Sequence, residues 1–226
     1  MLLHYEQNLL GRDFAVGDIH GHFSKLQIAL DRMGFNPKQD RLFAVGDLVD
    51  RGPESEQVID WLNKPWFHGL KGNHEDIAIR YAKGNAIDPE SYRFNGGGWF
   101  MDLAHEEQQR YAQAFCALPM ALEVETAAGL VGLVHADCPE RTWSTLDDAL
   151  RASRATRDFC MWSRNRVQTA NASRVDGVRA VVVGHTPLAT PLLLGNVYHI
   201  DTGGWTDDGY FTLLNLQSLD LPPRAE

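Results

Sequence analysis

The sequence predicts an α/β protein whose first half is built on a largely parallel β-sheet. Short apolar runs at 12–16, 41–46 and 66–71 have the composition of buried strands. Between the first two of these runs, the apolar residues of segment 23–34 recur at the spacing of an amphipathic helix. The order strand–helix–strand–helix is typical of βαβ units, which place successive strands parallel in one sheet.

Further helices are expected where apolar residues keep helical spacing between turn-forming residues. They begin at Pro53 and lie at about 72–83, 106–117 and 147–153. Segments without such a pattern are expected to be irregular: 84–105, which reads as a surface loop or a lid, and 161–164, which reads as a loop. Residues 221–226 are expected to be a frayed end.

The second half of the chain predicts strands of mixed direction. Segments 120–125 and 130–134 are joined by a short turn and form a hairpin signal, so this part of the sheet is expected to be antiparallel or mixed. Segment 179–183 reads as the last parallel strand. Shorter strands are expected near 192–194, 197–201 and 210–216, and residues 1–11 read as a lead-in or an edge strand.

Composition limits the classes of function. A chain of 226 residues with 44% hydrophobic residues is long enough for one well-cored domain, which we expect to span 1–226 with a core of about 12–216. The net charge of −9 argues against nucleic acid and against anionic membrane as partners. We see no secretory signal and no run of membrane-spanning length, and three widely spaced cysteines favour buried, reduced thiols in a cytoplasmic protein.

Polar side chains follow several of the predicted strands at the same end. Residues 45–52, with the sequence VGDLVDRG, place two aspartates and an arginine directly after an apolar run. Residues 14–18 have nearly the same arrangement, in which an apolar run and a glycine lead into Asp18. Three later runs lead into Asn73, His135 and His185. A turn that uses Asp and Gly for their backbone habits would explain one such run. Five runs that deliver such side chains favour a site, because ligands bind at the carboxyl ends of strands in open α/β sheets.

These loops supply a mixed set of oxygen and nitrogen donors. The set contains Asp18, His20, Asp47, Asn73, His135 and His185. Six ligands exceed what one tetrahedral zinc uses, whereas two metals that share a bridging carboxylate would use them all. The imidazoles favour Mn, Fe or Zn over Mg or Ca. Two such ions can lower the pKa of a shared water from about 15.7 towards 7 and so provide a hydroxide that could attack phosphorus.

Other residues near these donors suit a phosphate ester. Arg51 and Arg164 could clamp phosphate oxygens with their fork-shaped guanidinium groups. His74, beside the donor Asn73, could protonate the leaving oxygen, and Asp50 is the carboxylate that we expect to hold its imidazole protonated.

The motifs together resemble those of a known family. GDIHG at 17–21, GDLVDRG at 46–52, GNHE at 72–75, VHA at 134–136 and GHT at 184–186 are similar to the ordered motifs of the calcineurin-like metallophosphoesterase superfamily. Within it they resemble the phosphoprotein phosphatases, in particular the short lambda-phage and bacterial type. The resemblance implies two mixed β-sheets that form a central sandwich flanked by helices.

The resemblance also implies roles for the site residues. Asp18, His20 and Asp47 would hold one metal, and Asp47, Asn73, His135 and His185 the other. Arg51, Arg164 and Asn73 would contact phosphate, and His74 paired with Asp50 would be the acid. The metals would be divalent, with Mn²⁺ expected and Fe or Zn as alternatives. Arg164 rests on a short Trp-x-Arg match, and Arg166 is its rival.

Three functions remain to be compared. The first is hydrolysis of phosphoserine or phosphothreonine monoesters in proteins, with phosphotyrosine as an additional candidate substrate and with no regulatory subunit implied. The second is symmetrical diadenosine tetraphosphate hydrolysis, whose enzymes typically carry Ala and Asp where this chain has Asp50 and Glu75. The third is a metal-binding adaptor without activity, which the retention of every ligand and of His74 disfavours.

Overall fold

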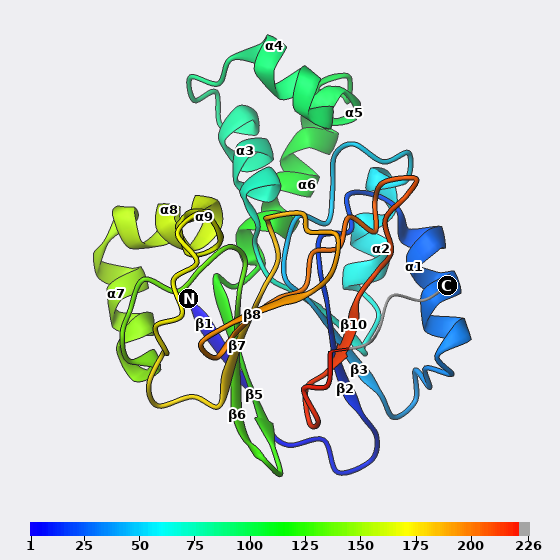
Figure 1. The fold of residues 1–226 in the computed structure, drawn as a ribbon. Helices are drawn as coiled ribbons and strands as arrows, with labels where there is room; N and C mark the ends of the chain where they lie inside the picture. Colours follow the sequence, from blue (N-terminus) through cyan, green and yellow to red (C-terminus); the bar gives the residue numbers. More distant parts are fainter. Residues whose placement is uncertain (222–226) are drawn as a thin grey trace.

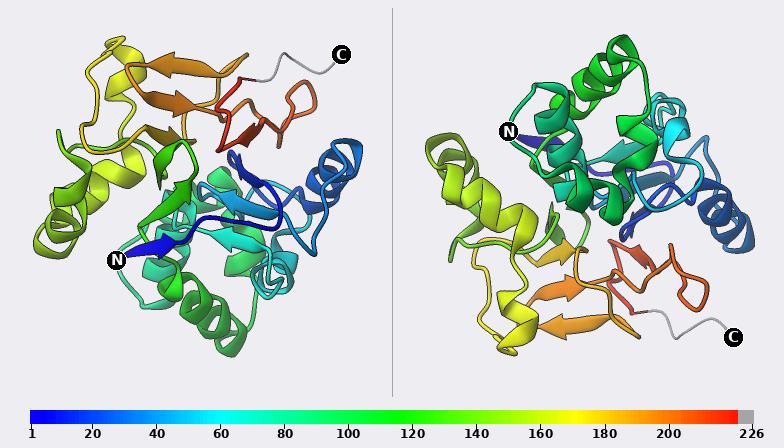
Figure 2. Two further views of the ribbon diagram at one scale, coloured as in Figure 1. Left: turned by 90° about the horizontal axis from the view of Figure 1, so that it is seen from below. Right: turned by 90° about the horizontal axis from the view of Figure 1, so that it is seen from above.

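The computed structural model describes residues 1–221 as two facing β-sheets with helices on their outer sides (Figure 1; Figure 2). Within that range a six-stranded sheet has the order β1-β5-β6-β7-β9-β8, and a four-stranded sheet has the order β10-β2-β3-β4. The strands are β1 (Leu2–Tyr5), β2 (Asp13–Val16), β3 (Arg41–Ala44), β4 (Phe67–Gly69), β5 (Ala121–Thr126), β6 (Gly129–Val134), β7 (Ala180–Val183), β8 (Leu192–Leu194), β9 (Val197–His199) and β10 (Leu213–Asn215). Of the frayed end expected at 221–226, residues 222–226 lie outside the described part.

Both sheets are mixed, as expected. Strands β2, β3 and β4 run parallel, and β10 pairs antiparallel with β2. The hairpin prediction is confirmed by the antiparallel pair β5–β6, and β1 is a parallel edge strand beside β5. The expectation that 179–183 is the last parallel strand is wrong. Strand β9 is also parallel to β7, because the chain crosses over through β8 before it returns.

Alternating side chains of β2 show how the layers are held together. Phe14 and Val16 belong to the apolar cluster under the helices, whereas Ala15 belongs to the cluster between the two sheets. Strand β3 repeats this pattern with Leu42 facing the helices and Phe43 facing the other sheet. Because successive strand side chains point to opposite faces, both faces of the four-stranded sheet are buried. The fold is therefore a sandwich of two sheets with outer helical layers.

Helices cover the outer face of each sheet. They are α1 (Phe23–Arg32), α2 (Val58–Leu62), α3 (Asn73–Ala82), α4 (Pro89–Tyr92), α5 (Gly98–Met101), α6 (His105–Ala117), α7 (Leu146–Ala152), α8 (Arg154–Trp162) and α9 (Asn165–Gln168). The apolar sides of α1, α2, α3 and α6 pack on the four-stranded sheet, and those of α7 and α8 pack on the six-stranded sheet (Figure 2). The buried apolar faces, rather than helix propensity alone, stabilise these short helices.

Three local expectations are wrong. No helix begins at Pro53 within the described chain, because residues 53–54 form a turn and a 3₁₀ turn, Ser55–Gln57, precedes α2. Segment 84–105 is not a loop but contains α4, a π-helical turn at Arg93–Gly97, and α5. Segment 161–164 is only partly a loop, since α8 continues to Trp162. The start of α8 is capped by the Ser153 hydroxyl, which accepts a hydrogen bond from the Thr156 N–H at 3.2 Å.

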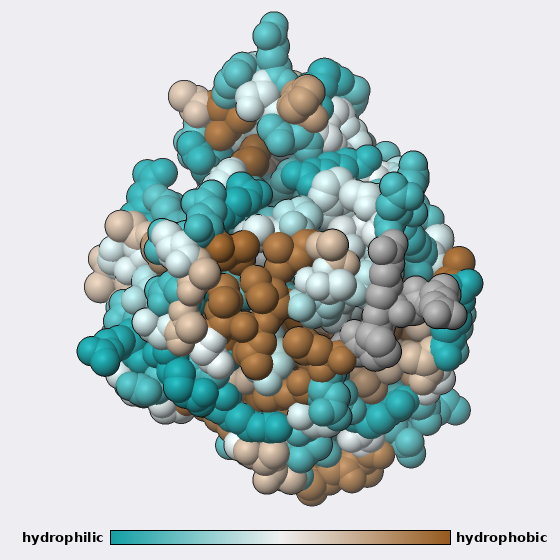
Figure 3. Space-filling model, in the orientation of Figure 1, coloured by the Kyte–Doolittle hydropathy of each residue, from teal (hydrophilic) through white to brown (hydrophobic). Residues whose placement is uncertain are grey.

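The face shown in Figure 3 carries a broad apolar region near its centre, besides smaller apolar areas elsewhere on it. The broad region lies over β8, whose Leu193 side chain is 42% exposed. Within residues 1–221, no helix combines the length and the apolar character that crossing a membrane requires. Cys138 and Cys160 are buried free thiols, as expected, whereas Cys116 is exposed and so corrects the expectation for that residue.

Candidate metal centre

The carboxyl ends of five strands meet at one place. Asp18 follows β2 and Asp47 follows β3, while Asn73 begins α3 just after β4. From the other sheet, His135 directly follows β6 and His185 lies two residues beyond β7. Because both sheets direct these ends to the same edge of the sandwich, side chains from distant segments come into contact.

A glycine permits one of these close approaches. A Cβ atom at Gly72 would lie only 2.2 Å from Oδ1 of Asp47. This oxygen instead accepts a hydrogen bond from the His74 N–H at 3.0 Å. The glycine of the GNHE motif therefore allows the loop after β4 to lie directly against the Asp47 carboxylate.

One cavity of about 160 Å³ collects most of the residues that the sequence singled out. Its walls include Asp18, His20, Asp47, Arg51, Asn73, His74, Arg164 and His185. His135 and Asp50 are fully buried behind these walls. Asn95, Trp162 and Pro187 complete the lining.

Backbone carbonyls fix the orientation of the three histidines in the donor set. The Nδ1–H of His20 donates to the Val49 carbonyl at 2.9 Å, and the Nδ1–H of His135 donates to the Val45 carbonyl at 2.7 Å. These bonds leave Nε2 of each ring as a ligand atom. His185 is turned the other way, because its Nε2–H donates to a carbonyl, that of Trp162, at 3.2 Å, so Nδ1 is the free atom.

Asp47 lies between two groups of possible ligands. Its Oδ2 is 3.7 Å from Nε2 of His20, and its Oδ1 is 3.4 Å from Nε2 of His135. Among residues 1–221, two sets of side chains could each hold a metal ion: His20, Asp47 and His74, and Asp47, His135 and His185. The two sets share Asp47 alone, so the geometry suits two cations with one carboxylate in common.

The first set contains His74 where the sequence led us to expect Asp18. Oδ2 of Asp18 is 3.9 Å from Nε2 of His20, so this carboxylate also reaches the same place. His74 already uses Nδ1 in a 2.7 Å bond to Asp50 and has only Nε2 available. The structure thus brings both Asp18 and His74 close to the same possible ion position beside His20.

The charge balance of the site calls for cations. Burial raises the pKa of Asp18 well above its usual value, and repulsion by Asp201 and Asp47 adds to this effect. Burial opposes protonation of His135, yet the charge of Asp47 and the hydrogen bond to it raise the pKa of this histidine to about 10. Oδ2 of Asp201 is buried without a hydrogen-bond partner in the described chain. Clustered acids of this kind are stabilised by metal ions, so the donor set fits divalent cations.

His74 and Asp50 form a buried pair at the edge of the cavity. Their 2.7 Å contact joins Nδ1 of the imidazole to Oδ2 of the carboxylate, and Nε2 lies 3.4 Å from a guanidinium nitrogen of Arg51. Burial opposes protonation of His74, but Asp47 and the bond to Asp50 outweigh it and raise its pKa. The expected pairing of His74 with Asp50 is thus present in the structure.

The two candidate arginines have different surroundings. The Arg164 side chain lines the cavity and donates to the His185 carbonyl at 3.4 Å. Arg166 is buried, donates to Asp137 at 2.7 Å, and also donates to the carbonyls of Asn171 and Ser173. Because its guanidinium is already bonded on several sides, Arg166 is not available to the cavity.

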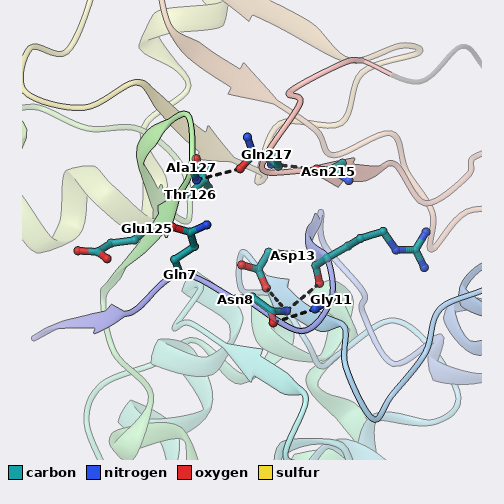
Figure 4. Close-up of a pocket in the computed structure, with 10 residues that line it drawn as sticks. Gln7, Asn8, Gly11, Asp13, Glu125, Thr126, Ala127, Asn215 and Gln217 are labelled. Carbon is teal, nitrogen blue, oxygen red and sulfur yellow. Dashed lines mark hydrogen bonds between the residues drawn. The ribbon is translucent and has the colours of Figure 1, made fainter.

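A second cavity, of about 320 Å³, lies at a different place, between residues 7–13 and 125–127 (Figure 4). Its polar groups are largely bonded to one another: the Asn8 amide donates to Oδ1 of Asp13 at 3.2 Å and to the Arg12 carbonyl at 3.4 Å. Asp13 also pairs with Arg41 at 2.8 Å. Its greater size therefore does not make it the reactive site, because satisfied polar groups offer little to a ligand.

Comparison with known proteins agrees with the geometry. Residues 14–205 match the family described as calcineurin-like phosphoesterase, and this range holds every residue of the cavity. The chain belongs to the calcineurin-like phosphoesterase family. It is 34% identical over 196 residues to serine/threonine-protein phosphatase 2 of Escherichia coli (strain K12), covering 84% of this chain and 86% of that protein.

Two further relatives extend the comparison with this family. Serine/threonine-protein phosphatase 1 of Salmonella typhimurium (strain LT2) is 34% identical over 211 residues, which is 90% of this chain and 91% of that protein. Among solved structures, one titled a putative diadenosine tetraphosphatase has a TM-score of 0.66 at 19% identity and covers 98% of this chain and 96% of its own. The structural likeness supports the fold, and family membership implies a centre of two divalent metals.

Four residues near the centre had no role assigned from the sequence. Glu75 accepts backbone hydrogen bonds from Asp47, Leu48 and Gly72, and so ties two site loops together. Asp201 was expected as the last residue of a strand at 197–201, but it follows β9, which ends at His199, so the strand-to-acid pattern could have revealed it. Trp99 and Trp205 are distant in sequence from the residues they contact, Asp50 and Arg51, and carried no local signal.

Proposed function

We propose that this calcineurin-like phosphoesterase hydrolyses phosphoserine and phosphothreonine monoesters in proteins, with phosphotyrosine as a further substrate. The observation that carries the proposal is the convergence of the donor set, the His74–Asp50 pair and two guanidinium groups on one cavity. The relatives named as serine/threonine-protein phosphatases, which match most of this chain, support the substrate class.

The donor set would hold two divalent cations, which we propose to be Mn²⁺, with Fe or Zn as alternatives. Asp18, His20 and Asp47 would bind one ion, and Asp47, Asn73, His135 and His185 the other. When bound, such ions neutralise phosphate charge and lower the pKa of water from about 15.7 to about 7. Oδ1 of Asn73 and Nε2 of His135 lie 3.0 Å apart, as two ligands of one ion would.

The remaining polar groups act on the phosphate and on the leaving group. Arg51, Arg164 and Asn73 all line the cavity and would bind phosphate oxygens there. His74 would donate the proton on Nε2 to the leaving oxygen, and Asp50 keeps the ring oriented through its bond to Nδ1. This assignment leaves Asp18, rather than His74, as the third ligand of the first ion.

Symmetrical diadenosine tetraphosphate hydrolysis remains the second candidate. A bis(5'-nucleosyl)-tetraphosphatase of Dechloromonas aromatica, described as symmetrical, is 40% identical, but over only 75 residues, or 32% of this chain. The presence of Asp50 in a bond with His74 favours the phosphatase. We further propose that the chain acts as a single cytoplasmic domain without a regulatory subunit.

A substrate panel tests the proposal. The purified chain with Mn²⁺ is assayed on phosphoserine, phosphothreonine and phosphotyrosine peptides, on diadenosine tetraphosphate and on p-nitrophenyl phosphate. We expect the phosphopeptides to be hydrolysed with a kcat/KM at least about tenfold above that for diadenosine tetraphosphate, a difference of about 1.4 kcal/mol in transition-state stabilisation. Preference for the dinucleotide would favour the second candidate, and no hydrolysis of any of them would favour an adaptor.

A further inference from the structure

Segment 84–105 touches the catalytic pair in a way that no motif predicts. The indole N–H of Trp99 donates to Oδ1 of Asp50 at 2.7 Å. The other oxygen of this carboxylate, Oδ2, is bonded to Nδ1 of His74 at the same distance. Asp50 is completely buried. The two side chains that bond to its carboxylate oxygens, His74 and Trp99, come from different segments of the chain.

Segment 84–105 also packs closely against the backbone beside Asp50. Asp50 and Arg51 have φ angles of 70° and 67°, in the left-handed region that non-glycine residues rarely adopt. Such a conformation persists only where surrounding contacts enforce it. Gly96 provides one of these contacts, because a Cβ atom there would lie 2.1 Å from the Arg51 backbone nitrogen. The Asp50 N–H is held from the other side by Oγ of Ser55 at 2.9 Å.

Trp99 is itself well anchored. Its ring packs edge-on against Tyr111 of α6, with centroids 5.2 Å apart, and lies 5.5 Å from the ring of Phe100. Phe100 is fully buried. The indole therefore has a fixed position relative to the helical layer, and its N–H can impose that position on the carboxylate.

We propose that Trp99 is a positioning residue, whose indole N–H fixes the Asp50 carboxylate so that His74 is aimed at the leaving oxygen. This inference rests on the proposed role of His74 as acid. It assigns segment 84–105 a function as a support that is part of the site, and not as a lid that opens and closes over it.

The test is the variant Trp99→Phe, which keeps an aromatic ring and removes the N–H. We expect kcat on a phosphoserine peptide to fall about tenfold with KM within twofold, since the alkoxide leaving group needs a well-aimed proton. On p-nitrophenyl phosphate, whose leaving anion is stable without a proton, the loss should stay below threefold. Equal losses on both substrates, or no loss on either, would overturn the proposal. Trp66→Phe, a similar change in the apolar cluster under the helices, should leave both rates within twofold.

A double-variant cycle separates positioning from a general structural effect. In an Asp50→Asn background, adding Trp99→Phe should cost less than twofold further, because the bond that it removes then serves no carboxylate. A full additional tenfold loss would show that Trp99 acts independently of Asp50 and would contradict the proposal.

A spectroscopic readout keeps this test distinct from a failure of the proposed function. In NMR spectra of the metal-free protein, the indole Hε1 signal of Trp99 is identified as the one that disappears in Trp99→Phe. This signal should exchange slowly with solvent hydrogen. Its chemical shift should change in Asp50→Asn and should not change in Trp66→Phe. If wild type hydrolyses no phosphoester yet shows this signature, the function is wrong and the positioning contact stands. A rapidly exchanging Trp99 signal that Asp50→Asn does not move would refute the contact itself.

Discussion

The guanidinium of Arg51 stacks on the indole of Trp205, with Cζ 4.3 Å from the ring centroid. The same indole lies edge-on to His20, with ring centroids 5.0 Å apart. A residue from the C-terminal part of the chain thus contacts both a proposed metal ligand and a proposed phosphate ligand. Stacking restricts the arginine while leaving its N–H groups free for an anion, which suits a phosphate clamp.

Removing this stack should weaken substrate binding. In Trp205→Leu, we expect KM for a phosphopeptide to rise about fivefold to tenfold, because a cation–π contact of about 1–2 kcal/mol no longer holds Arg51 in place. The inhibition constant of inorganic phosphate should rise by a similar factor. Steady-state kinetics measures both. An unchanged KM with a large fall in kcat would show that Trp205 acts on the chemical step through His20 and not on phosphate binding.

Replacing Asp47 should affect both metal positions at once. In Asp47→Asn, elemental analysis after loading with Mn²⁺ and desalting should find fewer than one ion per chain, because the carboxylate lies between both ligand groups. Asp18→Asn is the matched comparison, since the Asp18 carboxylate lies near a ligand nitrogen of the first group, Nε2 of His20, and meets the second group only at the backbone N–H of His185. Two ions retained in Asp47→Asn would disprove the shared position.

The role of His74 predicts a dependence on the leaving group. His74→Asn should lower kcat by about 10²- to 10⁴-fold on phosphoserine, the range for a general acid, and much less on p-nitrophenyl phosphate. If both substrates lost activity equally, His74 would serve as a ligand, as its place in one of the two ligand groups also allows. Metal content measured on the same variant would then fall by one ion.

We expect Glu75 to stabilise the folded chain by holding two loops of the site together. Its carboxylate accepts three backbone hydrogen bonds from the loops after β3 and β4, at 2.7–3.0 Å. Glu75→Ala should lower the free energy of unfolding by at least about 2 kcal/mol, because buried N–H groups lose their partners. Urea unfolding at neutral pH measures the change. Exposed Glu107→Ala should stay within about 0.5 kcal/mol, and a similarly small effect for Glu75→Ala would contradict the assignment.

We expect His68 to make the folded chain less stable in acid, and this effect does not involve the metal centre. Burial lowers its pKa to about 4, with a further decrease from Arg41, while Asp13 opposes the change, and its Nδ1 lies 3.3 Å from the Tyr5 hydroxyl. Because the folded-state pKa lies below the unfolded value of about 6.5, the unfolded chain binds the proton more tightly. The stabilising contribution is present above pH 6.5 and is lost as the pH falls towards 4.

This contribution can be isolated with two variants. In metal-free protein, the fall in the free energy of unfolding between pH 7 and 4 should be smaller by about 1–3 kcal/mol in His68→Gln than in wild type. His68→Phe should show the same flattening, since either change removes the titrating ring. A wild-type slope in both variants would mean that His68 does not titrate on unfolding.

Much of the site was predictable because its signals are local. Each donor lies within four residues of the end of an apolar strand, so the pattern around Asp18, Asp47 and His135 could be read without knowing the sheet order. The contacts of Trp99 and Trp205 could not be read in this way, because they join segments separated by tens of residues. The same reason explains the error at 84–105, where buried Tyr92 and Phe100 order a glycine-rich stretch that reads as a loop by composition.

The choice between Arg164 and Arg166 also needed three dimensions. The two arginines lie two residues apart, and nothing in the sequence around them shows which one reaches the cavity. The structure distinguishes them by the ion pair between Arg166 and Asp137. Asp137 lies beside His135 in the chain but faces away from the cavity, and it commits one arginine to a structural role.

A crystal structure of the wild-type chain with Mn²⁺, using anomalous scattering at a wavelength where manganese contributes, tests the central claim most directly. We predict two anomalous peaks about 3.5–4 Å apart with the Asp47 carboxylate between them, His20 at one and His135 at the other. A single peak, or two peaks that do not share Asp47, would contradict the account.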